Sequence, residues 1–256
     1  MSLQKIDRRR FIKTSTAAGG GLLLGFYFAE GASLAAQFGP PSGGPANPNA
    51  FVHITPDDFV TLIIHKAELG QGTVTSLSML MAEELECDWS KVRTEFAGVD
   101  VAYGAPLQGV FGSLSIRTTW TPLRKAGAAA REMLIEAAAK KWGVDPSQCR
   151  AANNAVINTA TNARLSYGSL AEAASKLPVP ANVTLKDPKQ FRLIGSSPKR
   201  LDTPSKVNGE ASFGIDVRVP GMLYAVLERC PVFGGKVVSF DATKAAAVAG
   251  SGAPEW

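Results

Sequence analysis

Hydrophobic and polar residues alternate in short blocks along the first part of the chain. Apolar runs at residues 51–54 and 59–64, separated by the polar turn 55–58, predict a β-hairpin. Apolar residues then recur at the spacing of one helix face over residues 74–85, which predicts an amphipathic helix. A further strand is predicted at residues 92–96.

A second block of the same kind follows. A loop of small and hydroxyl residues at 104–119 precedes an alanine-rich helix, which we predict over residues 122–142 with Pro122 in its first turn. A short helix is predicted over residues 169–176, capped by Tyr167-Gly168-Ser169. Before that helix, a hairpin is predicted from residues 155–158 and 164–167.

The ends of the two long helices correspond in sequence. Residues 85–93 align with residues 142–150, so that three pairs coincide: Asp88 with Asp145, Ser90 with Ser147, and Arg93 with Arg150. On this alignment Cys87 and Cys149 fall opposite apolar residues, which predicts that both thiols lie in the core. Two successive helix–turn–strand units indicate an α+β fold with α/β layers.

The pattern changes near residue 190. Strands are predicted beyond it at residues 213–217, 222–228 and 236–241, and a helix begins at Ala242. We divide the chain into four parts: residues 1–35, an export signal; 36–50, a proline- and glycine-rich linker; 51–190, a first domain; and 191–256, the start of a second domain that is too short to close its own core.

The first 35 residues resemble a twin-arginine export signal. A basic segment, Asp7-Arg8-Arg9-Arg10-Phe11-Ile12-Lys13, precedes a largely uncharged run over residues 14–29 and the small residues 33–35. An amphipathic N-terminal helix or a membrane anchor is the alternative. The signal predicts export through the twin-arginine translocon to the periplasm, with or without membrane association; cleavage after Ala35 is left open.

Charge and cysteine content exclude several classes of protein. The net charge is +5, but residues 1–35 hold five basic and two acidic side chains, so that only +2 remains for the rest; this argues against nucleic acid as a partner. The three cysteines are far apart and the chain has two histidines. These are too few ligands for an iron–sulfur cluster or a structural zinc site, and no c-type haem motif occurs. No metal ligand is assigned to this chain.

The turn Gly70-Gln71-Gly72 joins a predicted strand to a predicted helix. Bare backbone at a helix N-terminus suits an anion such as a phosphate or a pterin-type cofactor, although two glycines also serve simply to make a bend. Gly112, Ser113 and Ser115 form a second candidate before the next helix, with a plain surface loop as the alternative. A nucleotide-phosphate site is weaker, because the turn has neither a third glycine nor Gly-Lys-Ser/Thr.

Several motifs, in this order and spacing, carry a resemblance to a known family. They are residues 67–73 (AELGQGT), 81–89 (MAEELECDW), 122–134 (PLRKAGAAAREML), 165–168 (LSYG), 200–202 (RLD), 206–209 (KVNG) and 220–225 (PGMLYA). The chain resembles the molybdenum-binding large subunit of the xanthine dehydrogenase and aldehyde oxidase superfamily. It is most like the isoquinoline 1-oxidoreductase beta-subunit group and related exported aldehyde dehydrogenases.

The resemblance implies a partial molybdopterin-binding domain followed by an incomplete hammerhead-like α+β domain. It implies that Gly70, Gln71 and Gly72 contact molybdopterin with its molybdenum, in the cytosine dinucleotide form, and that the Gln71 side chain donates to an oxo ligand or a pterin heteroatom. Gly112, Ser113 and Ser115 take the position of the small-residue loop near the metal.

The same resemblance implies a reaction and its partners. A molybdenum hydroxylase places water-derived oxygen on an electron-poor carbon of a small-molecule substrate, an N-heteroaromatic ring or an aldehyde. The electrons leave for a small [2Fe–2S] subunit and pass from there to a c-type cytochrome subunit.

The general-base glutamate of the family is expected in a C-terminal part that this sequence does not contain, so we assign no catalytic residue and expect the chain alone to be inactive. A non-catalytic exported binding or interaction domain on the same fold remains the alternative.

Overall fold

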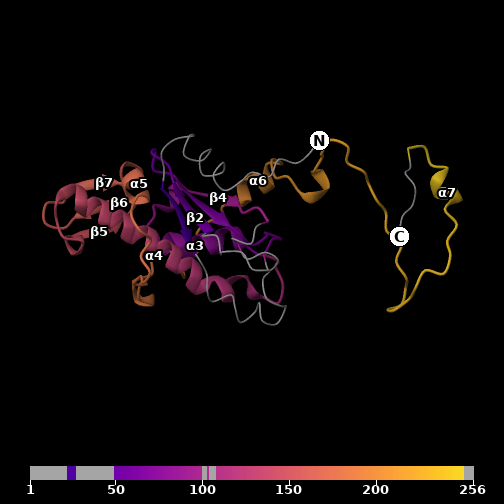
Figure 1. Cartoon of the computed structure of the whole chain (residues 1–256), viewed down its shortest axis with the longest axis horizontal. Coiled ribbons are helices and arrows are strands. Elements are labelled where there is room, and N and C mark those ends of the chain that lie inside the picture. The colour runs from indigo at the N-terminus through magenta and orange to yellow at the C-terminus, as the bar shows by residue number, and fades with distance from the viewer. Residues whose placement is uncertain (1–21, 27–48, 100–102, 104–107, 251–256) are drawn as a thin grey trace. The chain divides into compact units, whose positions relative to one another are not determined.

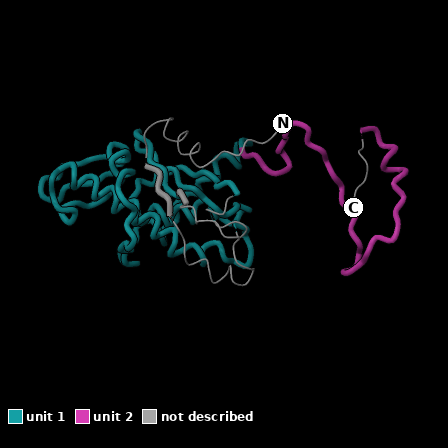
Figure 2. The backbone as a smooth tube through the Cα atoms, viewed as in Figure 1, with its two compact units in different colours: residues 1–210 teal, residues 211–256 magenta. Residues whose placement is uncertain are grey.

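The computed structural model describes residues 22–26, 49–99, 103 and 108–250 (Figure 1). The chain forms two compact units, residues 1–210 and residues 211–256 (Figure 2). Both β-sheets and the long helices belong to the first unit. No helix in the described part of the chain is both long and apolar enough to cross a membrane.

The larger sheet has four strands in the order β1-β2-β3-β4. Their bounds are Leu22–Phe26, Asn49–Ile54, Val60–Ile64 and Val92–Phe96. β2 and β3 form the predicted hairpin, closed by the amide of Asp58 donating to the Thr55 carbonyl at 3.0 Å. β4 runs parallel to β3, so the connection between them is a crossover that contains a helix.

β1 lies within the stretch that we predict to be an export signal. It pairs antiparallel with β2 and forms one edge of the sheet. The twin arginine, the linker and the rest of the signal fall outside the described residues. The export signal therefore stays a prediction.

The three longest helices and a second sheet complete the core of the first unit, and the α+β class is confirmed. The helices are α3 (Thr73–Leu85), α4 (Leu114–Trp142) and α5 (Tyr167–Ser175). The antiparallel strands β5 (Cys149–Ala152), β6 (Ala155–Asn158) and β7 (Arg164–Ser166) form the second sheet. α3 and α4 pack against each other and against strands of the larger sheet (Figure 1).

Two predicted helix starts were wrong. α4 begins at Leu114, so Pro122 lies inside the helix. Ile116 and Trp120 pack against the core, and this burial outweighs the loss of the single hydrogen bond that an interior proline cannot donate. α5 begins at Tyr167 because Ser166 caps it, and the buried Tyr167 hydroxyl donates to the Leu85 carbonyl at 2.6 Å.

The predicted correspondence between the two helix–turn–strand units is confirmed. Asp88 caps the 3-10 turn η2 (Trp89–Lys91) by accepting from the Ser90 amide at 3.0 Å. Asp145 caps η4 (Pro146–Gln148) in the same way, accepting from the Ser147 amide at 2.9 Å. Cys149 is buried and Cys87 packs against the core, and burial raises the pKa of both thiols.

The contact between α3 and α4 depends on one glycine and one buried carboxylate. A Cβ atom at Gly127 would lie 2.3 Å from the carbonyl oxygen of Met81, so only glycine permits this approach. The Glu84 side chain is fully buried and accepts from Arg124 Nε at 2.8 Å and from Arg131 Nη1 at 3.4 Å. The Lys186 amide also donates to Glu84, at 3.0 Å. The buried charge is therefore paired and fully hydrogen-bonded.

The second unit lacks the strands that we predict for it. Within residues 211–250 its regular elements are η6 (Gly214–Asp216) and the short helix α7 (Thr243–Ala246), which confirms the helix predicted from Ala242. The predicted strands at 213–217, 222–228 and 236–241 are wrong for this structure. Their apolar side chains, such as those of Val226 and Val238, are exposed. A strand forms only where a neighbour takes up its backbone hydrogen bonds.

We expect Gly127→Ala to destabilise the protein. Overpacking against a backbone oxygen costs about 1–3 kcal/mol, which exceeds the gain of about 1 kcal/mol in helix propensity. Gly98→Ala is the matched control, since a Cβ there meets nothing within 4 Å. Urea unfolding of both variants measures the difference; a Gly127→Ala variant as stable as the control would contradict the close approach.

We expect Glu84→Ala to cost about 3–5 kcal/mol in the free energy of unfolding, because it leaves Arg124 buried without its carboxylate. Glu136→Ala is the control: it breaks an exposed ion pair with Lys140 on α4, and such pairs are worth about 1 kcal/mol or less. Similar urea unfolding midpoints for the two variants would show that the buried ion pair does not stabilise the contact between α3 and α4.

Candidate functional site

The turn Gly70-Gln71-Gly72 lies where the sequence predicts it, between β3 and α3. Gly70 and Gly72 have φ of 105° and 90°, a backbone conformation that favours glycine. A Cβ atom at either position would meet nothing within 4 Å. The outer side of the turn is therefore bare backbone, open to the close approach of a ligand.

The N-terminus of α3 already holds an anion, the carboxylate of Glu68. It accepts from the amides of Gly70 at 2.7 Å, Gly72 at 2.9 Å and Val74 at 3.0 Å. Burial alone would raise the pKa of Glu68, but these three donors hold it below its ordinary value. The backbone N–H groups that we expected to bind a ligand anion thus already donate to Glu68.

Gln71 is exposed and folds back on its own turn. Its amide nitrogen donates to the carbonyl of Ala67 at 2.9 Å, and its side-chain oxygen accepts from the amide of Leu69 at 2.5 Å. One N–H of the side chain is therefore used locally, and an amide nitrogen carries two. A donation from Gln71 to a cofactor stays a prediction.

The second predicted loop leads into α4. Gly112 and Ser113 have φ of 57° and 54°, both are exposed, and the Ser113 side chain makes no capping hydrogen bond at the helix start. Ser115 lies in the first turn of α4, and its carbonyl accepts from the Thr119 hydroxyl at 2.5 Å. These three residues thus lie at the N-terminus of α4, as the Gly70-Gln71-Gly72 turn lies at that of α3.

Lys66 brings the two loops into contact. It lies two residues after the end of β3, its side chain is buried, and its ammonium donates to the carbonyl of Gly109 at 3.3 Å. Burial lowers the pKa of Lys66. Sequence reasoning passed over this residue, although a lysine between a buried strand and a glycine-rich turn is a visible signal.

A partly buried imidazole with a buried Nδ1 atom lies beside this contact. The His65 ring meets Phe51 edge-to-face at a centroid distance of 5.3 Å, and Phe51 meets Tyr103, which directly precedes the second loop, at 5.5 Å. Among the described residues, His65 Nδ1 is the one buried side-chain nitrogen or oxygen without a hydrogen-bond partner. Burial lowers the pKa of His65 to about 4, with the charge of Lys66 adding to the shift, so the ring is neutral at pH 7.

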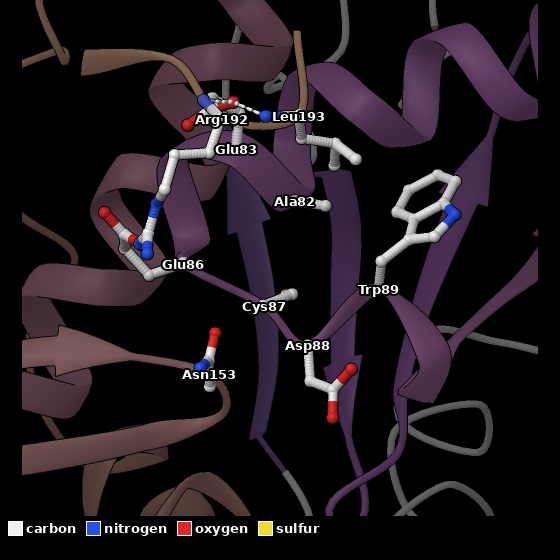
Figure 3. Close-up of a pocket in the computed structure, with 9 residues that line it drawn as sticks. All are labelled: Ala82, Glu83, Glu86, Cys87, Asp88, Trp89, Asn153, Arg192 and Leu193. Carbon is white, nitrogen blue, oxygen red and sulfur yellow. Dashed lines mark hydrogen bonds and ion pairs between the residues drawn. The ribbon is translucent and has the colours of Figure 1, made fainter. Parts of the chain in front are cut away.

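A hollow of about 360 Å³ lies beside the C-terminal end of α3 (Figure 3). The Arg192 guanidinium pairs with the Glu86 carboxylate, and Glu83 accepts from the amides of Arg192 and Leu193 at 3.0 and 2.7 Å. Glu83, Glu86 and Arg192, which line the hollow, thus already form hydrogen bonds or ion pairs within the protein. The residues around the hollow are Ala82, Glu83, Glu86, Cys87, Asp88, Trp89, Asn153, Arg192 and Leu193.

No group of three or more histidine, cysteine, aspartate or glutamate side chains converges within the described residues in a way that could hold a metal ion. The carboxylates at both ends of α3 are saturated with amide and cationic donors. What the arrangement offers chemically is therefore two neighbouring helix-start loops of bare backbone, amide and hydroxyl groups.

A family described as molybdopterin cofactor-binding domain matches residues 6–217 of the chain. A membrane-bound aldehyde dehydrogenase [pyrroloquinoline-quinone] of Gluconacetobacter polyoxogenes is 36% identical over 96% of this chain. The beta subunit of isoquinoline 1-oxidoreductase of Brevundimonas diminuta is 35% identical over 76% of it, and a nicotinate dehydrogenase subunit of Pseudomonas putida is 31% identical over 77%.

The chain spans only part of these relatives: 32%, 30% and 17% of their respective lengths. Among solved structures, quinoline 2-oxidoreductase from Pseudomonas putida 86 is similar over 68% of this chain and 23% of its own, at 19% identity and a TM-score of 0.41. A Cu,Mo-CO dehydrogenase is similar over 48% of this chain and 15% of its own, at 21% identity and a TM-score of 0.40.

We expect the partly buried imidazole of His65 to make the protein less stable in acid. The pKa of His65 is about 4 in the folded chain and about 6.5 when unfolded, so the unfolded chain binds a proton first as the pH falls. The free energy of unfolding should drop by about 3 kcal/mol between pH 6.5 and 4 through this group. Urea unfolding at pH 7 and pH 4.5 should show a smaller loss for His65→Phe; equal losses would contradict the burial.

Proposed function

Because the chain belongs to the molybdopterin cofactor-binding domain family, we propose that it forms one wall of the cofactor site in an oxidoreductase of the molybdenum hydroxylase type. The observation that carries the proposal is the family match over residues 6–217, which includes both candidate loops. The names of three relatives support the reaction class, since each is a dehydrogenase or an oxidoreductase.

The proposed substrate is an aldehyde or an N-heteroaromatic ring, oxidised at an electron-poor carbon with oxygen from water. The relatives' names support these two classes, as they specify an aldehyde, isoquinoline and nicotinate.

Electrons from the reaction pass, in this proposal, to a separate small [2Fe–2S] subunit and then to a c-type cytochrome. Two of the relatives are named as subunits, which supports a multi-subunit enzyme. Cys87, Cys149 and Cys230 are too few and too scattered to hold a cluster themselves. Export through the twin-arginine translocon, to the periplasm, belongs to the same proposal and rests on the sequence of residues 1–35.

The candidate loops fit the cofactor in part. The bare outer side of Gly70 and Gly72 fits the close approach of a flat pterin, and Gln71 carries a second N–H for it. The α3 amides do not fit an additional anion, because Glu68 takes them. The pterin, in its cytosine dinucleotide form, would supply the redox-active molybdenum, and the turn would orient it.

Gly112, Ser113 and Ser115 would form the neighbouring part of this wall, since Lys66 ties their loop to the first one. We assign no general base among the described residues: Glu68, Glu83 and Glu84 are held as hydrogen-bonded anions. We therefore expect the isolated chain to have no catalytic activity. A non-catalytic exported domain on the same fold is the second candidate, favoured by the internal use of the α3 amides and of Gln71.

We expect the isolated chain to show weak, saturable binding of molybdopterin freshly released from a donor molybdenum enzyme, and no turnover. Gln71→Ala should weaken this binding by about tenfold, the value of one hydrogen bond to a ligand. Gln190→Ala is the matched control, because it removes another exposed glutamine that bonds its own turn, at η5 (Pro188–Gln190). Equilibrium dialysis measures both affinities.

Three outcomes of the dialysis would count against the proposal. Equal affinities of the two variants would remove Gln71 from the site, and absence of saturable binding would favour the non-catalytic domain. Tighter binding of pyrroloquinoline quinone, the cofactor in the aldehyde dehydrogenase's name, than of the pterin would indicate that the site binds the quinone instead. Turnover by the isolated chain would refute its inactivity.

A further inference from the structure

The Gly70-Gln71-Gly72 turn is held from outside by a residue far along the chain, Arg200. Its Nη1 donates to the carbonyl of Gly70 at 2.9 Å, and its Nη2 donates to Glu68 at 3.2 Å. The Glu68 side chain is 5% exposed and that of Arg200 is 38% exposed. The guanidinium thus covers the carboxylate that occupies the helix N-terminus.

A second carboxylate orients the guanidinium. Asp202 accepts from Arg200 Nε at 3.0 Å and from Nη2 at 2.9 Å, a bidentate pair. Lys206 pairs with the same carboxylate from the helix α6 (Thr203–Val207). Because Glu68 and Asp202 face each other as anions, Arg200 also screens their mutual repulsion.

The segment that carries Arg200 is docked independently on α3. The amide of Leu201 donates to the Thr75 hydroxyl at 3.0 Å, and Thr75 is buried in the first turn of α3. Arg200 therefore starts from a fixed backbone position. Its planar fork serves Gly70, Glu68 and Asp202 together, which a lysine ammonium cannot match in geometry.

We propose that Arg200 is a positioning residue for the Gly70-Gln71-Gly72 turn, pinning the Gly70 carbonyl and the Glu68 carboxylate so that the bare face of the turn keeps its shape. This rests on the proposed function only in naming that face as the cofactor wall. The segment of residues 199–207 thereby becomes a strap across the base of the site. Arg200 holds Glu68 in place, and the Glu68 carboxylate accepts the hydrogen bonds of the amides at the N-terminus of α3.

Amide hydrogen exchange of the whole chain tests this role without any cofactor. In Arg200→Gln, peptides covering residues 66–76 and 197–208 should exchange about tenfold faster, because the bonds to Gly70 and Glu68 are lost. Arg200→Lys should restore part of the protection. Arg164→Gln, at an exposed arginine of β7, should exchange like the wild type. Wild-type exchange in Arg200→Gln would overturn the proposal.

A double-mutant cycle separates positioning from general stability. If Arg200 acts through Glu68, Arg200→Gln should accelerate exchange at residues 66–76 much less in a Glu68→Gln background than in the wild type. Equal acceleration in both backgrounds would overturn the link. Should Arg200→Gln fail to fold, Asp202→Asn takes its place, since it removes the carboxylate that orients the guanidinium; unchanged exchange in that variant would overturn the proposal too.

Molybdopterin binding adds a readout that a purely structural role would not move. Arg200→Gln should weaken the dialysis affinity at a temperature well below its thermal midpoint, with Arg200→Lys in between and Arg164→Gln unchanged. Unaltered affinity in Arg200→Gln would overturn the role at the site. If the wild-type chain binds no pterin, the proposed function fails, while the exchange experiment still decides whether Arg200 positions the turn.

Discussion

The close contact between α3 and α4 is the constraint on which the first unit depends. The helices approach so closely at Gly127 that a methyl group would overlap the Met81 carbonyl. Beside this contact, Glu84 holds a buried negative charge against two arginines of α4. The close packing at Gly127 and the buried ion pairs of Glu84 can both be satisfied in only one register of the two helices. Both helices begin at the candidate loops, so this register also sets where the loops lie.

Carboxylates saturated by backbone amides recur at both ends of α3. At the C-terminal end, Glu83 accepts from the amides of three consecutive residues, 192–194, and holds an extended segment in place. At the N-terminal end, Glu68 accepts from three amides of its own turn and is covered by Arg200. Chain segments more than a hundred residues away are thereby fastened to one helix. Such charge-assisted bonds are strong where water is excluded.

The local elements of the first unit were largely predictable because they are amphipathic over short distances. The β2–β3 hairpin, α3 and the twin turns at Asp88 and Asp145 follow from periodicity and capping residues that neighbour one another in sequence. The start of α4 was not predictable, because burial of Ile116 and Trp120 overrides the usual meaning of Pro122. The strands expected after residue 211 failed for a related reason: their pattern requires neighbours that the described chain does not place beside them.

The candidate site divides in the same way. Sequence alone determined the family motifs, the glycines of the turn and the exclusion of an iron–sulfur cluster in this chain, because these depend on residue type and spacing. Only the tertiary structure decided that Glu68 fills the helix N-terminus, that Lys66 joins the two loops, and that Arg200 secures the turn. The last two contacts join residues 43 and 130 positions apart. Their strength comes from burial and geometry, which a linear pattern does not contain.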